Sequence, residues 1–136
     1  MAPLRRYEEF EDESGRTVRY RRGDAGGLVA TEAEVAEDAL IGDQTWVDPG
    51  ARVGAGARVG ARGWVRAGAF VGAHARLGVG VQVGRDALVG AGARIGAHVE
   101  IGAGARIEPG AVVPDEVRVP AGATVVRGQE RHALAA

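Results

Sequence analysis

The sequence predicts an all-β solenoid, in which short parallel strands stack into successive coils. A branched aliphatic residue occupies every sixth position from Val29 to Val125 without a break. The fourth residue after each aliphatic is small or β-branched, and glycine often follows the aliphatic directly. A helix needs a period of about 3.6 residues and is destabilised by so many glycines, so this pattern favours short strands joined by tight turns. The aliphatic and the small residue point into a narrow core that only stacked neighbours can complete.

Composition limits the classes of function. The 136 residues carry a formal net charge of −1 and include no cysteine, which excludes disulfides, thiolate metal sites and cysteine nucleophiles. The near-neutral charge and the lack of a recognition motif argue against nucleic-acid binding. No apolar run approaches the roughly 20 residues of a membrane span, and the first residues lack the apolar segment of a signal peptide. We therefore expect a cytoplasmic protein without a membrane partner.

Three segments are expected along the chain. Residues 1–28 are predicted to form an N-terminal cap, because residues 5–10 and 17–20 flank a turn-like stretch at 13–16, as in a β-hairpin. Residues 29–126 form the repeat domain, and residues 127–136 form a short C-terminal tail or helix. The ends of a solenoid expose strand edges and core, so a hairpin at the first coil would cover them.

The repeat units VGAGAR at residues 53–58 and IGAGAR at residues 101–106 resemble the hexapeptide-repeat family, which includes the acyltransferase superfamily. The leader "YEEF…SGRTVRY…GDAGGLV" is similar to that of uncharacterised phage and bacterial hexapeptide proteins. The resemblance implies a left-handed parallel β-helix of triangular coils, with three hexapeptides in each coil. Residues 18 apart then lie one above another, and the repeats make about five coils.

Stacking at 18 residues arranges the outward side chains in columns on three faces. One column begins with Trp46 and Trp64, an aromatic step suited either to binding a ring or to packing against the hairpin. A second column holds Phe70 and Leu88, and its apolar centre between arginines predicts a subunit interface.

The third column places three arginines on successive coils: Arg58, Arg76 and Arg94. Their guanidinium groups repel one another unless they face water or an anion. The alternatives to solvation are an acidic or anionic ligand, such as a phosphate, and the acidic run at residues 8–13 of the same or another subunit.

The resemblance also bears on catalysis, because many relatives transfer acyl groups from acetyl-CoA or acyl carrier protein. They work as trimers with a histidine general base in a cleft between subunits, and γ-class carbonic anhydrases instead hold a metal with three histidines. Here His98 has Glu116 one coil further on, which makes the two a candidate catalytic pair. His74 has only Gly92 at the matching place, and the two histidines fall on different corners, so no metal site is expected.

These observations predict a rigid scaffold or binding module that assembles with itself as a trimer and has no catalytic site or cofactor of its own. The unbroken repeat supports this prediction, because it lacks the protruding loops that build a pocket wall. The alternative is an acyl-CoA-dependent acyltransferase with its active sites in inter-subunit clefts and acyl-CoA as co-substrate. A metal site like that of γ-carbonic anhydrase is a third, less favoured alternative.

Overall fold

Each repeat position forms a short strand in the computed structural model, which describes residues 7–12, 14–23 and 25–128. A typical strand is two residues long, with the first side chain exposed and the second buried, as in β11 (Arg76–Leu77). This part of the chain consists of strands, turns and connecting segments, and no helix in it could span a membrane.

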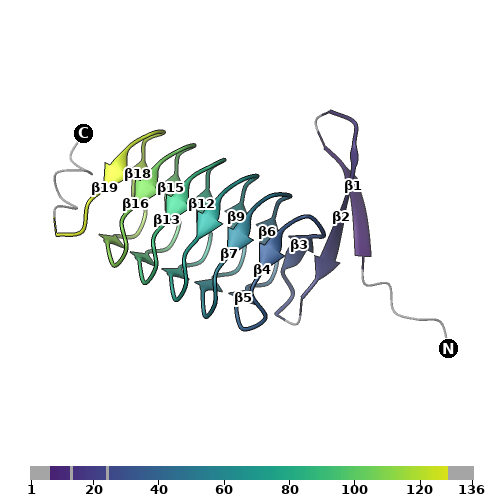
Figure 1. The fold of residues 1–136 in the computed structure, drawn as a ribbon, viewed down its shortest axis with the longest axis horizontal. Helices are drawn as coiled ribbons and strands as arrows, with labels where there is room; N and C mark the ends of the chain where they lie inside the picture. Colours follow the sequence, from purple (N-terminus) through teal and green to yellow (C-terminus); the bar gives the residue numbers. More distant parts are fainter. Residues whose placement is uncertain (1–6, 13, 24, 129–136) are drawn as a thin grey trace.

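The strands form three sheets that run along the solenoid as its faces (Figure 1). Sheet A contains, in spatial order, β1 (Tyr7–Glu11), β2 (Thr17–Arg22), β3 (Leu28–Ala30), β6 (Trp46–Val47), β9 (Trp64–Val65), β12 (Gln82–Val83), β15 (Glu100–Ile101) and β18 (Arg118–Val119). Sheet B contains β4 (Glu34–Val35), β7 (Arg52–Val53), β10 (Phe70–Val71), β13 (Leu88–Val89), β16 (Arg106–Ile107) and β19 (Thr124–Val125). Sheet C contains β5 (Leu40–Ile41), β8 (Arg58–Val59), β11, β14 (Arg94–Ile95) and β17 (Val112–Val113).

The register between coils is the predicted one. From β3 onward every strand pairs in parallel with the strand one coil away, and the paired residues are 18 apart, as Val71 is with Val53 and Val89. Three hexapeptides therefore complete each coil, and about five coils stack along the axis (Figure 1). This is the architecture of a left-handed parallel β-helix, so the predicted fold is confirmed.

The core consists of the two columns that the repeat predicts. The aliphatic column and the small-residue column are both buried over most of their length, with Val89 and Ala93 fully enclosed. Thr45 is the buried polar residue of the described part. Its hydroxyl donates a hydrogen bond to the carbonyl of Gly60 at 2.6 Å and accepts one from the Gly63 amide at 3.0 Å, so its burial leaves no polar atom unpaired.

Successive coils approach so closely that the residue after the aliphatic cannot carry a side chain at several corners. A Cβ on Gly72 would lie 2.5 Å from the backbone nitrogen of Ala91 in the next coil. Two residues further on, the corner takes a positive φ, which most coils assign to glycine. His74 and His98 adopt it instead, at φ 61° and 56°, so both histidines stand at corners of the helix.

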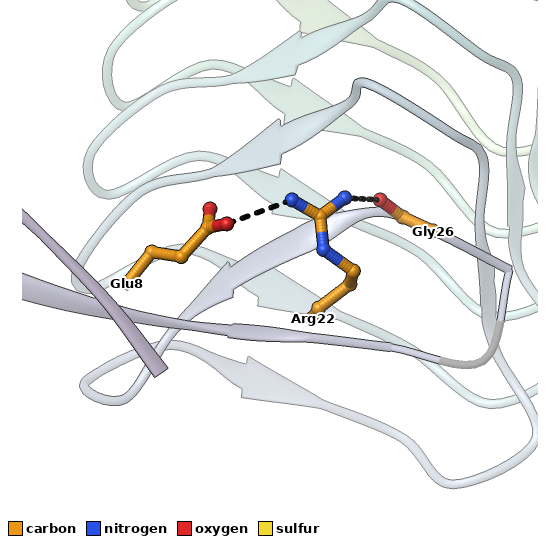
Figure 2. Close-up of polar contacts among 3 residues, drawn as sticks. All are labelled: Glu8, Arg22 and Gly26. Carbon is orange, nitrogen blue, oxygen red and sulfur yellow. Dashed lines mark hydrogen bonds and ion pairs between the residues drawn. The ribbon is translucent and has the colours of Figure 1, made fainter. Parts of the chain in front are cut away.

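The N-terminal hairpin continues sheet A beyond the first coil (Figure 1). The antiparallel pairs β1–β2 and β2–β3 cover the strand edge that the first coil would otherwise expose. Arg22 fastens the hairpin, because its guanidinium donates to the Glu8 carboxylate at 2.9 Å and to the Gly26 carbonyl at 3.1 Å (Figure 2). The predicted hairpin cap is confirmed, whereas the expected tail or helix falls largely on residues 129–136, outside the described residues.

The hairpin turn is closed by one carboxylate. Asp12 accepts hydrogen bonds from the Ser14 hydroxyl at 2.6 Å and from the amides of Ser14 and Arg16 at 2.9 Å each. These donors, the Ser14 hydroxyl first, lower the pKa of Asp12 below its ordinary value. The Asp12 carboxylate is therefore engaged in hydrogen bonds within its own turn.

Shortening a buried aliphatic side chain should strongly destabilise the β-helix. Ile107 is fully buried, so Ile107→Ala is expected to lower the free energy of unfolding by about 2–5 kcal/mol, through lost burial and the cavity left behind. The matched control is Val112→Ala, whose side chain is 48% exposed and whose loss is expected to cost less than about 0.5 kcal/mol. Urea unfolding measures both, and equal losses would contradict a core confined to the inward columns.

Candidate functional site

The two tryptophans of sheet A have different surroundings. Trp46 and Trp64 are direct neighbours in register, as their spacing predicts. Trp46 is covered by the hairpin, with its ring 4.9 Å from that of Phe10 and 5.1 Å from that of Tyr20, both in edge-to-face geometry. The rings of Trp46 and Tyr20 pack with Leu28 in a second, small hydrophobic cluster on the outer surface of sheet A. Trp46 therefore packs against the hairpin, whereas Trp64 stays 38% exposed.

Asp48 connects the hairpin to the second coil. One of its carboxylate oxygens accepts a hydrogen bond from the Tyr20 hydroxyl at 3.0 Å, and the other accepts one from the Trp64 indole nitrogen at 2.8 Å. Burial, followed by the negative charge of Asp48, raises the pKa of Tyr20 above its ordinary value. Tyr20 therefore remains a neutral donor, and the three side chains hold one another in place.

A cavity of about 590 Å³ opens between the hairpin and the first coils. Its lining residues are Phe10, Glu11, Asp12, Ser14, Tyr20, Trp46, Asp48, Trp64, Arg66 and Arg85. The guanidinium of Arg66 lies over the Trp64 ring, 4.4 Å from its centroid. Stacking at 18 residues predicts the two tryptophans of this lining, whereas the other lining residues come from the hairpin or from a corner of the β-helix.

The Phe70 and Leu88 side chains form an exposed apolar pair on sheet B. They are neighbours in register and are 39% and 42% exposed. Charged residues flank them along the column, since Arg52 pairs with Glu34 at 3.4 Å on one side and Arg106 follows on the other. The structure thus places an apolar patch between charged ends on this face.

The arginine column stands on sheet C as its spacing predicts. Arg76 is in register with Arg58 and with Arg94, and none of the three forms an ion pair within the described residues. The acidic hairpin of the same chain does not supply partners, because Glu8 and Glu9 pair with hairpin arginines instead. Water, another subunit or an anionic ligand remain the partners open to this column.

The two corner histidines are exposed and separate from each other. Each ring lies next to a glycine of the preceding coil, His74 beside Gly56 and His98 beside Gly80. Glu116 follows His98 one coil further on, on the opposite side from Gly80, and no hydrogen bond joins the two side chains in the described structure. No group of three or more potential metal ligands occurs among the described residues.

Comparison with protein families identifies the repeat. A model described as bacterial transferase hexapeptide (six repeats) matches residues 80–115. A second, described as hexapeptide repeat of succinyl-transferase, matches residues 65–93. Among curated proteins, none matches the chain.

Comparison with solved structures agrees with these families. A variant of perosamine N-acetyltransferase from Caulobacter crescentus, in complex with CoA and GDP-perosamine, shares 28% identity at a TM-score of 0.73, over 74% of this chain and 48% of that one. A second variant of the enzyme, in a complex with the same two molecules, shares 29% identity at the same TM-score and coverage. WeeI from Acinetobacter baumannii AYE, at 22% identity and a TM-score of 0.57, covers 76% of this chain and 56% of its own, and shows the fold alone.

Residues 65–93 and 80–115 therefore match models of hexapeptide repeats, and the β-helix of this chain is similar to that of perosamine N-acetyltransferase. The chain spans about half the length of the Caulobacter enzyme chains that it matches.

The raised pKa of Tyr20 should make stability depend on pH. Its neutral phenol contributes stability that is fully present below the ordinary tyrosine pKa of 10.0 and is lost as the pH rises above that value. We expect the free energy of unfolding to fall between about pH 9 and pH 11, and to fall less in Tyr20→Phe, which has no ionisable phenol there. Urea unfolding across this range measures the difference, and identical slopes would contradict the role assigned to Tyr20.

The apolar patch of sheet B should support self-association. The double change Phe70→Glu and Leu88→Glu places charges at the centre of the patch and is expected to prevent the predicted self-association. Leu40→Glu with Val112→Glu is the matched control on sheet C, where both side chains are similarly exposed, at 50% and 48%. Light scattering gives both masses, and an unaltered mass in the sheet B variant would remove this face from the interface.

Proposed function

We propose that this protein is an acyl-CoA-dependent acyltransferase whose active sites lie in clefts between the subunits of a homotrimer. The observation that carries the proposal is the likeness to perosamine N-acetyltransferase, at 28% identity and a TM-score of 0.73, in a structure that contains CoA. The descriptions of both matching family models also name transferases. The scaffold predicted from the sequence becomes the second candidate.

The geometry supports a site shared between subunits. From β3 to β19 the coils consist of strands of two or three residues and tight turns, so the faces of sheets B and C carry no protruding loop. A small molecule needs a concave site, and two such faces brought together would provide one. The exposed Phe70 and Leu88 pair gives a surface through which copies can associate.

His98 is the proposed general base. Its imidazole stands at an open corner, where it can reach a substrate held between two subunits, and imidazole is the side chain best suited to accept a proton near neutral pH. Glu116 follows at the same corner and is the proposed positioning partner for the His98 ring. The group that accepts the acyl chain would lose its proton to His98 as it attacks the thioester carbonyl. The C–S bond of the thioester then breaks, and the CoA thiolate leaves as the free thiol after it takes the proton from His98.

Two observations favour a rigid scaffold. The coils run without interruption from β3 to β19, and His98 and Glu116 are not joined by a hydrogen bond in the described structure. A homo-oligomer with this surface would present regular columns of side chains, including the arginines of sheet C, to a partner.

Native mass spectrometry with and without acetyl-CoA separates the two functions. The acyltransferase predicts a trimer that gains one CoA per chain, whereas the scaffold predicts an assembly that ignores it.

Replacing the proposed base should then stop the chemistry without dissociating the trimer. His98→Ala is expected to lower acetyl transfer by about 10²–10⁴-fold, measured as release of free CoA thiol, while CoA binding persists. His74→Ala is the matched control, because it removes an exposed corner histidine in the same backbone conformation. Full activity in His98→Ala would exclude this residue as the base, and loss in both variants would point to a structural effect.

A further inference from the structure

We infer that the cavity beneath the N-terminal hairpin binds a small aromatic anion, a ligand that combines a planar ring with a phosphate or carboxylate group. The site is separate from the residues proposed for acyl transfer, because neither His98 nor Glu116 is among its lining residues. Its volume, about 590 Å³, falls in the usual range of ligand sites, roughly 300–1,000 Å³.

The walls provide surfaces for a ring. Phe10 and Trp64 line the cavity and are 40% and 38% exposed, so each offers aromatic surface that the fold has not covered. The Trp64 indole is fixed through its hydrogen bond to Asp48, which is itself held by Tyr20. A rigid aromatic wall binds a planar ring at little cost in side-chain entropy.

Two cations in the cavity lack an anionic partner. Neither Arg66 nor Arg85 forms an ion pair within the described residues, although Arg22, Arg52 and Arg118 each pair with a glutamate. Arg66 is stacked over Trp64, and its Nε is shielded from solvent without an acceptor. A guanidinium that has lost part of its water in this way attracts an anion more strongly than a fully solvated one.

The acidic residues of the lining form no ion pair with these arginines in the described structure. Both carboxylate oxygens of Asp48 accept hydrogen bonds, from Tyr20 and Trp64, and Asp12 is engaged by its own turn. Asp12 and Asp48 keep their negative charges, which their hydrogen bonds stabilise, whereas the Glu11 side chain forms no hydrogen bond or ion pair in the described structure. Glu11 is therefore the acid whose neutralisation is expected to favour an incoming anion.

This combination of side chains does not recur along the helix. At the positions equivalent to Trp64 and Arg66 the next coil has Gln82 and Gly84, and the position equivalent to Arg85 in the next coil is Ala103. Aromatic and cationic side chains therefore gather at the corner that the hairpin overhangs. The packing of the core does not require this, since all of these positions point outward.

The tryptophans allow the site to be tested directly. Trp46 and Trp64 are the only two in the sequence and both line the cavity, so a change in tryptophan fluorescence reports on this place. The probes are adenosine monophosphate, phenylacetate and inorganic phosphate, with calorimetry as a second readout. We expect saturable binding of one of the two aromatic anions with a dissociation constant below about 1 mM. Binding of the nucleotide alone would indicate a phosphate ligand, and binding of phenylacetate alone a carboxylate.

Variants distinguish specific binding in the cavity from a general attraction of anions to arginine side chains. Arg85→Gln is expected to weaken binding at least about tenfold, and Glu11→Gln to strengthen it, while the control Arg76→Gln on sheet C leaves it unchanged. His98→Ala should bind as the parent does, whatever its effect on acyl transfer. Failure of both aromatic anions to saturate, binding of inorganic phosphate as tightly as either, or equal loss in Arg85→Gln and Arg76→Gln would overturn the proposal.

Discussion

The close approach of successive coils is the constraint on which the rest of this structure depends. Backbone groups of one coil bond directly to those of the next, as the Gly72 amide does to the Val89 carbonyl at 2.7 Å, and neighbouring strands lie about 4.8 Å apart. At several corners this distance leaves no room for a Cβ, so glycine follows the aliphatic there. Inside the helix the same spacing permits one large and one small side chain in each hexapeptide. The six-residue repeat of aliphatic, glycine and small residues therefore follows from this packing.

Stacking also controls the outer surface. Because every coil repeats the same geometry, residues 18 apart must stand side by side whatever their chemistry. The arrangement brings Arg76 next to Arg94, which repel, as readily as it brings Phe70 next to Leu88. The faces that result are regular and flat, which suits the packing of whole faces against each other and leaves a single coil little concavity in which to hold a small molecule.

The hairpin interrupts this regularity at one end. It extends sheet A with antiparallel strands and places Phe10 and Tyr20 over Trp46, which creates a second small core outside the first. The network of Tyr20, Asp48 and Trp64 then holds the hairpin above the second coil. A concave, chemically mixed cavity arises here because the parallel stacking ends here. The described residues thus form two kinds of surface, the flat faces of the β-helix and a concave cavity beside the hairpin.

Much of the fold followed from the sequence, because a period of six residues with alternating large and small positions admits few other structures. The coils, their register, the columns Trp46–Trp64 and Arg58–Arg76–Arg94, and the hairpin could all be predicted, since each depends on neighbours at a constant spacing. The cavity could not be predicted in this way. Asp48, Arg66 and Arg85 lie at corners of the β-helix, and Phe10 lies in the hairpin. These side chains line one cavity only because of the way the non-repeating hairpin lies over the β-helix. The sequence by itself determined the solenoid through local repetition, and only the tertiary structure decided the ligand-sized cavity, because side-chain contacts between unlike elements have no period to reveal them.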